Sequence, residues 1–426
     1  MTMQPLGAWS NWSGLHHAQP HLYVPPDVAG IQHLVKEHAK IRVVGAGHSF
    51  SPLVLTNEVM IQLDQLKGID ATDDEHCQST IYAGTRLYDV GEKLAGFNQA
   101  LMNQGDIDQQ SLAGAIATGT HGTGAHLPCL SAFVKGFELV TADSDVIWCD
   151  AEQNQSIFDA GRVALGSLGI MTKIKLQNRP MYRLKETIRL CSFQELFANL
   201  EQWKEQYRHI EFFAFIHSDV VLLKTLDETK DPLAPKKETW LDEDALLYLC
   251  AELTRIFPRA NAYLQRLIYW LIKPSLHVDW SSRIFASARQ TKFNEMEYQL
   301  PVSEGISCFQ EVFKTLQRQR APMFFPLEFR YVKADDIWLS PFYQRDSISI
   351  SVHQFYKQNH QEIFASVEPI FLKYQGRPHW GKLHSLSALQ LSALYPKWDH
   401  FMQMRQQLDP KGKWMNAYLE DLFLHK

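Results

Sequence analysis

The sequence predicts an α+β protein with two domains, and three observations lead to this fold class. Helix-like and strand-like stretches alternate over residues 23–110, and glycine-rich loops interrupt them. The chain has 426 residues, which is enough for two domains of ordinary size. Its composition shifts near residue 180, where a second run of strand and helix patterns begins.

Composition and charge exclude several classes of partner. Hydrophobic residues make up 45% and charged residues 21%, which is the mix of a globular protein. The net charge of −5 gives no overall basic footprint for nucleic acid or for a membrane surface. No apolar run reaches the roughly 20 residues that span a bilayer, and the N-terminus lacks a signal-peptide pattern. With six scattered cysteines and no C-x-x-C pair, we expect a cytoplasmic protein with reduced thiols.

The first half is expected to alternate helices and strands up to about residue 177. The expected helices are 25–40 and 86–95, and the expected strands are 41–47, 58–66 and 79–85. Residues 133–150 predict a β-hairpin whose turn lies at 142–145. The stretch 165–177 is expected to close this half.

The second half is expected to be larger and to carry a helical insertion. Residues 180–225 predict a strand, a helix and two strands. Residues 226–240 are charged and contain prolines, which favours a surface excursion. A helical stretch follows from about 245 to 272, and residues 323–356 are again strand-like.

The stretch "RVVGAGHSFS" at 42–51 invites comparison with a dinucleotide-binding turn. Gly45 and Gly47 match the first two glycines of that motif, but Phe50 occupies the third position. The segment before the next strand is too short for a crossover helix and contains Pro52, so the βαβ unit cannot form. The glycines still allow a ligand or its phosphates to approach the backbone. A second small-residue loop, "ATGTHGTGAH" at 117–126, offers the same property.

Five segments together resemble one family of flavoproteins. They are "GAGHSFS" (45–51), "SLAGAIATGTHGTGA" (111–125), "LEFRYVKADDIWLSPFYQRDS" (327–347), "RPHWGKLH" (377–384) and "DPKGKWMNAYLEDLF" (409–423). In this order they resemble the aldonolactone oxidase and alditol oxidase group of the vanillyl-alcohol-oxidase-type flavoproteins. The resemblance implies an FAD-binding domain at 1–178 and an α+β cap domain at 179–408. It also implies a C-terminal segment, 409–426, that returns to the FAD domain.

The resemblance implies FAD as the cofactor, joined covalently through His48. A neutral imidazole at the edge of the flavin suits that bond, although some relatives bind the flavin without it, which leaves a simple loop role for His48 open. The other implied cofactor contacts are Gly45, Ala46, Gly47, Ser49, Phe50, Ser111, Gly119, Thr120, His121, Gly122, Gly169 and Ile170.

The resemblance also implies the residues of the chemistry. Glu328 and Arg330 stand two apart on an expected strand, hence on one face, where they would hold the substrate hydroxyls. Lys382 would place a fixed cation near the flavin. Ser111 is a further implied substrate contact. Where alditol oxidases carry a histidine this chain has Ser351. Either His353, two residues later on the same face, substitutes for that histidine, or a small gap shifts the register.

The resemblance implies oxidation of an alcohol on a sugar lactone or sugar alcohol, with oxygen reoxidising the flavin to give hydrogen peroxide. Two alternatives remain: a dehydrogenase of the same fold with a protein or quinone acceptor, and a non-catalytic flavin-binding electron-transfer partner. The spacings of His121, His126, His379 and His384 match no common zinc pattern, so no metal is expected.

Overall fold

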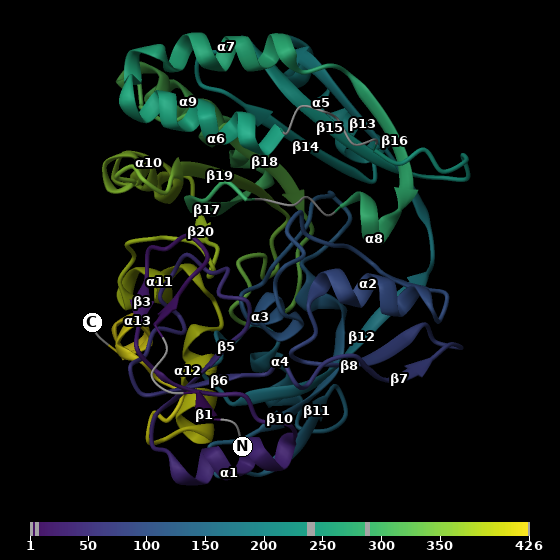
Figure 1. The fold of residues 1–426 in the computed structure, drawn as a ribbon, viewed down its shortest axis with the longest axis vertical. Helices are drawn as coiled ribbons and strands as arrows, with labels where there is room; N and C mark the ends of the chain where they lie inside the picture. Colours follow the sequence, from purple (N-terminus) through teal and green to yellow (C-terminus); the bar gives the residue numbers. More distant parts are fainter. Residues whose placement is uncertain (1–2, 5–7, 237–242, 286–289, 425–426) are drawn as a thin grey trace.

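The computed structural model describes residues 3–4, 8–236, 243–285 and 290–424, and in it two halves lie against each other (Figure 1). The first half ends with strand β12, Ile170–Pro180, and the second begins with strand β13, Arg183–Ser192. Residues 181–182 join the two strands, so the chain passes directly from one half to the other. The boundary predicted at residue 178 lies just before this passage and stays a prediction.

A small sheet carries the first glycine loop. Its strands have the order β1-β4-β6-β5, and β4, β6 and β5 are parallel. Their bounds, with the helix beside them, are β1 Met3–Gln4, β4 His21–Tyr23, β5 Ile41–Val44, β6 Val59–Gln62 and α1 Val28–Glu37. No helix occurs in residues 45–58, all of which are described, so the predicted absence of a crossover helix is confirmed.

A second, antiparallel sheet completes the first half. Its order is β11-β10-β12-β8-β7, and β9 pairs with β12. The strands are β7 Ile69–Asp73, β8 Gln78–Tyr82, β9 Gln99–Leu101, β10 Val134–Val140 and β11 Val146–Asp150. The helices of this half are α2 Leu87–Ala95, α3 Leu112–Ala117, α4 Gln155–Gly161 and the 3-10 turn η1 Leu130–Phe133. The hairpin predicted at 133–150 is confirmed as β10 and β11. A separate pair, β2 Trp9–Ser10 and β3 His17–Ala18, lies near the N-terminus.

The second half is built on an antiparallel sheet of order β16-β13-β15-β14-β18-β19-β17-β20. Its further strands are β14 His209–Ala214, β15 Val220–Thr229, β16 Ser275–Trp280, β17 Phe293–Pro301, β18 Leu327–Val332, β19 Ser347–Phe355 and β20 Arg377–Pro378. Because side chains alternate along a strand, each central strand has an apolar and a polar face. On β18, Leu327 and Phe329 belong to the hydrophobic core, while Glu328 and Arg330 point the other way.

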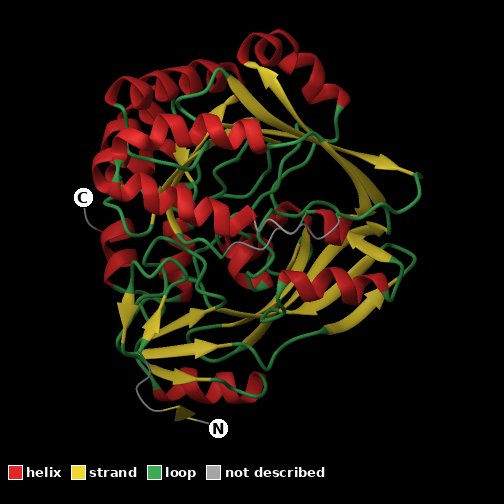
Figure 2. Ribbon diagram, turned by 45° about the horizontal axis from the view of Figure 1, so that its top comes forward, coloured by secondary structure: helices red, strands yellow, loops and turns green. Residues whose placement is uncertain are grey.

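Helices cover the apolar face of this sheet and leave the polar face toward the first half. Figure 2 shows a stack of helices beside the strands of the second half. The covering helices are α5 Phe193–Gln206, α9 Val302–Gln319 and α10 Gln361–Lys373. The remaining ones are α6 Glu243–Ile256, η2 Pro258–Ala260, α7 Asn261–Leu271, α8 Ser281–Ile284, α11 Ala388–Leu394, α12 Trp398–Leu408 and α13 Ala417–Leu424. Among the helices described, none is both long enough and apolar enough to cross a membrane.

One prediction for the second half needs correction. The surface excursion predicted at 226–240 is wrong at its start, because β15 continues to Thr229 through pairing with β13; residues 237–240 lie outside the described part. The helical stretch predicted at 245–272 is confirmed, and it consists of two helices, α6 and α7. Pro258 begins the turn between them, since proline lacks the amide hydrogen that a continuous helix needs.

The C-terminal segment lies against the first sheet. The Ile41 amide donates to the Lys413 carbonyl over 2.9 Å, and the Arg42 guanidinium donates to the Trp414 carbonyl. The Asn416 side chain donates to the carbonyl of Pro52 over 3.0 Å. These bonds tie residues 413–416 to both ends of the first glycine loop.

Candidate active site between the two halves

Two cavities meet where the first half faces the polar side of the large sheet. The first has a volume of about 130 Å³ and lies among loops of the first half. The second has a volume of about 610 Å³ and lies between those loops and the sheet. His48, Ser49, Gln110 and Thr118 line both cavities. An elongated ligand in the first cavity can therefore continue into the second.

Small residues form the first cavity, as an FAD site requires. Its walls include the predicted cofactor residues Gly45, Ala46, Gly47, His48, Ser49, Ser111, Gly169 and Ile170. A Cβ atom at Gly45 would lie 2.1 Å from the Ser111 hydroxyl oxygen, and Gly47 has a φ of +68°. Side chains are thus excluded where the chain turns, which leaves backbone amides free to approach a phosphate. A narrow glycine-walled cavity that opens into a wider one fits a flavin dinucleotide.

His48 stands at the junction of the two cavities as a neutral imidazole. Its ring stacks on Trp12 with centroids 5.5 Å apart and planes 22° apart. Burial, followed by the positive charges of Lys382 and Arg86, lowers the pKa of His48 to about 4. The ring is therefore unprotonated at neutral pH, the form that can act as a nucleophile.

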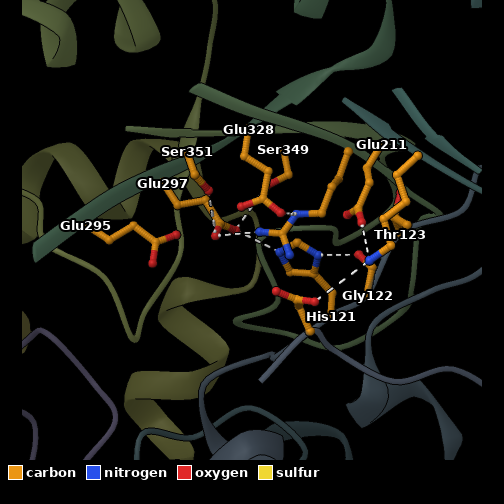
Figure 3. A network of polar contacts seen from close by, with 12 residues as sticks. His121, Gly122, Thr123, Glu211, Glu295, Glu297, Glu328, Ser349 and Ser351 are labelled. Atoms are coloured by element: carbon orange, nitrogen blue, oxygen red, sulfur yellow. Dashed lines mark hydrogen bonds and ion pairs between the residues drawn. The ribbon is translucent and has the colours of Figure 1, made fainter. Parts of the chain in front are cut away.

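Polar residues of neighbouring strands stand side by side on the wall of the second cavity. Arg330 on β18 lies opposite Glu211 on β14 and opposite Ser349 on β19. Glu297 on β17 lies opposite Ser351 on β19. Charged and hydroxyl groups from four strands therefore share one face of the sheet (Figure 3).

Glu297 is the centre of this polar face. Its oxygens accept hydrogen bonds from His121, Gln299, Arg330, Ser349 and Ser351. The His121 ring lies with Nε2 2.7 Å from this carboxylate and Nδ1 2.8 Å from the Gly122 carbonyl (Figure 3). Both partners are hydrogen-bond acceptors, so the two ring nitrogens of His121 fix its orientation between the carboxylate and the carbonyl. Burial alone would raise the pKa of Glu297, but the nearby histidines and Arg330 hold it well below its ordinary value.

Glu295 fixes the cation nearest the glycine loop. Its carboxylate pairs with the Lys382 ammonium and lies 3.5 Å from Nε2 of His353. Burial opposes the charge of Glu295, but Lys382 and His353 outweigh burial and lower its pKa to about 2. The Lys382 ammonium also lies 4.9 Å from the centre of the Phe50 ring. Lys382 is therefore held as a cation beside the loop that carries His48.

Glu328 makes longer polar contacts than Glu295 and Glu297 do. Its oxygens lie 3.4 Å from Nε of Arg330 and 4.0 Å from Nε2 of His353. Burial disfavours the charge on Arg330, but the surrounding glutamates, with Glu328 first, raise its pKa above the ordinary value. The pair therefore offers a permanent donor and an acceptor to a ligand in the cavity.

A second charged cluster lies on the same face of the sheet. The Lys224 ammonium is 3.1 Å from Glu211, 3.5 Å from Glu186 and 3.9 Å from Asp106. Burial disfavours its charge, but these three carboxylates raise the pKa of Lys224. Three carboxylates thus share one ammonium, and the cluster is negative overall.

The structure brings most of the predicted site residues together. The second cavity is lined by Phe50, Thr120, His121, Glu328, Arg330, His353 and Lys382. Ser111 lines the first cavity and is not among the described residues that line the second, so its implied contact is on the cofactor side. Gly119, with a φ of +72°, and Gly122, where a Cβ would lie 2.3 Å from the Gln104 carbonyl oxygen, shape the loop that carries His121.

Sequence reasoning missed Glu295, Glu297, Glu211 and Lys224. One signal was available for the first two, because "NEMEYQ" at 294–299 alternates polar and apolar residues within a strand. Such alternation also describes a surface strand, so it does not by itself mark a cavity.

Two groups of ligand-type atoms occur within the described residues. His121, Glu297 and His379 form one, and Glu295, Glu328 and His353 form the other, with atoms within 4.8 Å of one another in each. Spacings between histidines alone do not include Glu297, which lies far from His121 along the chain. Its oxygens already accept five hydrogen bonds, and Nδ1 of His379 accepts from the Gly381 amide over 3.0 Å. Hydrogen bonding thus accounts for the first group, and the absence of a metal stays a prediction.

Two family models match the chain in succession. The model described as an FAD binding domain matches residues 25–150, and the one described as D-arabinono-1,4-lactone oxidase matches residues 174–422. The first range contains the glycine loops, and the second contains the polar face of the sheet.

Named relatives match along the whole chain. An L-gulono-1,4-lactone dehydrogenase of Mycobacterium tuberculosis is 35% identical over 98% of each chain. An L-gulonolactone oxidase of Scyliorhinus torazame is 31% identical, covering 97% of this chain and 98% of the relative. Among solved structures, cholesterol oxidase from B. sterolicum matches with a TM-score of 0.84 and 16% identity, over 98% of this chain and 96% of that one. At this identity the last similarity shows the fold, which is that of the two-domain flavoproteins.

Proposed function

The chain belongs to the D-arabinono-1,4-lactone oxidase family, and on this basis we propose that it oxidises an alcohol group of a sugar lactone with FAD. The observation that carries the proposal is the junction of the two cavities. There the neutral ring of His48 lies beside a face that presents Glu328, Arg330 and Lys382.

We propose that FAD lies in the first cavity and reaches the second at His48, to which it is joined covalently. The support is the stacked, uncharged imidazole, whose form suits attack on an electrophilic carbon of the flavin. Ser49 and Thr118 would contact the same part of the cofactor, because they too line both cavities.

The substrate hydroxyl is held between Arg330 and Glu328. The bound FAD supplies the acceptor for the hydride that leaves the carbon of the CH–OH group. Arg330 donates hydrogen bonds to the substrate oxygen, and Glu328 accepts the hydroxyl proton. The alcohol thereby loses a hydride and a proton and becomes a carbonyl. The lactone is thus oriented by groups that are fixed before it binds.

Lys382 supplies positive charge at the glycine-loop end of the cavity. Its partner Glu295 is buried and ionised, so the ammonium cannot swing away without leaving a buried carboxylate alone. A fixed cation there favours negative charge that develops during the reaction.

The charges of the second cavity favour a neutral, hydroxylated substrate. Carboxylates outnumber lysine and arginine side chains on its walls, because Asp106, Glu186, Asp244, Glu295, Glu297 and Glu328 line it together with Lys224, Lys236, Arg330 and Lys382. Hydroxyl groups can donate to these carboxylates, whereas an anion would be repelled. We therefore propose that the lactone binds and that the open-chain sugar acid does not, with sugar alcohols as the second neutral class.

We propose oxygen as the acceptor that regenerates the cofactor, as the names of the gulonolactone oxidases indicate for those relatives. The mycobacterial relative is named a dehydrogenase, which favours a different acceptor as the second candidate. One mole of peroxide per mole of lactone oxidised supports the first, and turnover only with an added dye supports the second.

The compartment proposed is the cytoplasm. All six cysteines are free thiols. Five of them are buried, so their lack of a disulfide says little about the compartment, and Cys77 is the partly exposed one. Reduced thiols fit a compartment kept reducing by the cell.

Steady-state turnover tests the proposal. The purified protein should oxidise sugar 1,4-lactones, and the sodium salts of the same sugar acids should give less than a tenth of that kcat/KM. Arg330→Lys keeps the charge but loses the planar donor pair, and we expect kcat to fall about 100-fold or more. Turnover of the acid salts at the rate of the lactones would refute the substrate class, and an unaffected Arg330→Lys variant would refute the role of Arg330.

A further inference from the structure

Helices α6 and α7 form a hairpin with an unusual outer face. They lie at the end of the molecule opposite α1 and are joined through the turn η2 (Figure 1). Of the 14 large apolar side chains that are exposed among the described residues, nine lie between Leu233 and Leu276. The outer patch, as we call it, consists of Leu249, Ile256, Phe257, Tyr263, Leu267 and Leu271.

Helix α7 exposes large apolar side chains, while its buried side holds polar as well as apolar residues. Its inward side chains Asn261 and Gln265 are 2% and 0% exposed and donate to carbonyls of the segment before β18, including that of Met323. Its outward side chains include Tyr263, which is 74% exposed, and Leu267. A helix of a water-surrounded domain places apolar residues inward and polar residues outward. The outer side of α7 therefore has the composition of a face that is covered.

The charge around the outer patch identifies what covers it. Between residues 253 and 276 the sequence contains four basic residues, Arg255, Arg259, Arg266 and Lys273, and no acidic residue. The neighbouring Glu252 is already paired with Arg255 and Lys357. The whole chain has a net charge of −5, so this basic segment runs against the overall charge.

We propose that the outer patch binds the surface of a membrane that carries anionic lipids. Apolar side chains flanked by arginine and lysine are the features that place a helix in the interface of a bilayer rather than across it. The basic residues attract anionic headgroups, while Phe257, Leu267 and their neighbours enter the boundary between headgroups and acyl chains. Inward residues of the same helices, Leu247, Ile268 and Ile272, line the second cavity. The attached face is thus the outer side of a wall of the active site.

Vesicle sedimentation tests this inference. The full-length protein with its flavin is spun with vesicles of phosphatidylcholine alone, or of phosphatidylcholine mixed with phosphatidylglycerol. We expect binding to the mixed vesicles that is at least tenfold stronger than to phosphatidylcholine, and that weakens in about 1 M salt, where charge attraction is screened within ~3 Å.

Two pairs of variants separate the contributions. Leu267→Asn with Leu271→Asn removes apolar area, and Leu389→Asn, a change at an exposed leucine on α11, is its control. Arg259→Gln with Lys273→Gln removes two charges and is expected to lower the partition coefficient about 30-fold. The exposed Lys36 and Lys411, changed together to Gln, form the charge-matched control.

Loss of binding in the two patch variants and full binding in the controls supports the inference. No binding to the mixed vesicles overturns it, and so does equal binding by patch and control variants. A wild-type dimer that the leucine variant dissociates also overturns it, because a second copy of the chain would then cover the patch. Flavin absorbance and the melting temperature of each variant, measured alongside, show that it is folded.

Discussion

At the scale of single residues, Glu297 organises the charge of the second cavity. It is 1% exposed and accepts from Arg330, from His121 and from three uncharged side chains. Arg330 in turn reaches toward Glu328, which we propose as the proton acceptor. Glu297 is thus a positioning residue, because it acts on the substrate through the direction of the Arg330 guanidinium.

Glu297→Gln is expected to destabilise the protein and to impair turnover. The substitution keeps the shape of the side chain but removes the counter-charge that Glu297 gives the buried Arg330 guanidinium, which costs about 3 kcal/mol or more. We expect the urea midpoint to fall accordingly and kcat to fall further than KM rises. Ser349→Ala is the matched control, because it removes one hydrogen bond to the same carboxylate, worth about 1 kcal/mol. Equal effects of the two substitutions would show that the charge of Glu297 is unimportant.

The covalent link through His48 has a direct test. Acid-precipitated wild-type protein should retain the yellow flavin in the pellet, and the His48→Ala variant should release it to the supernatant. His17→Ala, at an exposed histidine nearby in sequence, should behave as wild type. Wild-type colour in the supernatant would leave FAD binding intact but remove the bond.

The sequence predicted the residues that short motifs mark and missed those that only strand pairing brings together. Glu328, Arg330 and Lys382 lie in recognisable segments, and the structure places all three on the second cavity. Glu297 meets His121 across 176 positions of chain, so no local pattern reports the contact. Ser111 was assigned to cofactor and substrate alike, and its cavity matches the first role.

At the scale of elements, the site depends on alternation along β17, β18 and β19. On each strand one set of side chains packs into the core under α9 while the other set faces the cavity. A shift of register by one residue would exchange the two sets. The catalytic face is therefore specified by the same pattern that builds the core.

The glycine loop at 45–47 is the element on which we expect cofactor binding to depend most. Gly45→Ala would place its Cβ against the Ser111 hydroxyl oxygen at the start of α3, so the loop or the helix must move. Strain of this kind costs about 1–3 kcal/mol, and we expect the affinity for FAD to fall about tenfold or more. The measurement is flavin content per protein after dialysis. Gly96→Ala, at a helix end with a φ of −62°, is the control and should retain its flavin.

Helices, strands and loops were predicted correctly where short-range sequence signals determine them. The hairpin at 133–150 and the missing crossover helix both follow from short-range signals, turn residues in one case and Phe50 with Pro52 in the other. The extension of β15 to Thr229 does not follow from such signals. Its last residues are charged or polar, and they form a strand only because they pair with β13. The overall charge likewise concealed the basic segment at 253–276.

At the scale of the whole molecule, buried histidines join the two halves. His209 on β14 is fully buried, and its Nδ1 donates to the Thr123 carbonyl of the first half over 2.7 Å. Burial lowers the pKa of His209 to about 3 and that of His379 to about 3. Both rings are neutral in the folded protein at neutral pH.

Stability is therefore expected to fall as the pH falls below 6.5. Below that value the unfolded chain protonates these histidines while the folded chain does not, so the free energy of unfolding declines until the folded pKa is reached. Between pH 6.5 and about 4.5 each such histidine removes about 2 kcal/mol.

His209→Gln isolates one of these contributions. The amide can still donate to Thr123 but does not titrate, so we expect a shallower loss of stability over the same pH range. Urea unfolding at a series of pH values provides the measurement. A variant with the same pH slope as wild type would assign the acid sensitivity to other groups.

The most direct test of the central claim is the reduction of the flavin by a lactone without oxygen. The holoprotein is mixed anaerobically with L-gulono-1,4-lactone or D-arabinono-1,4-lactone, the compounds in the names of its relatives, and the visible flavin absorbance is followed. The account predicts rapid bleaching in the wild type and slow or no bleaching in Glu328→Gln and Arg330→Lys. A wild-type flavin that dithionite bleaches but neither lactone, nor any other sugar lactone or sugar alcohol, reduces would contradict it.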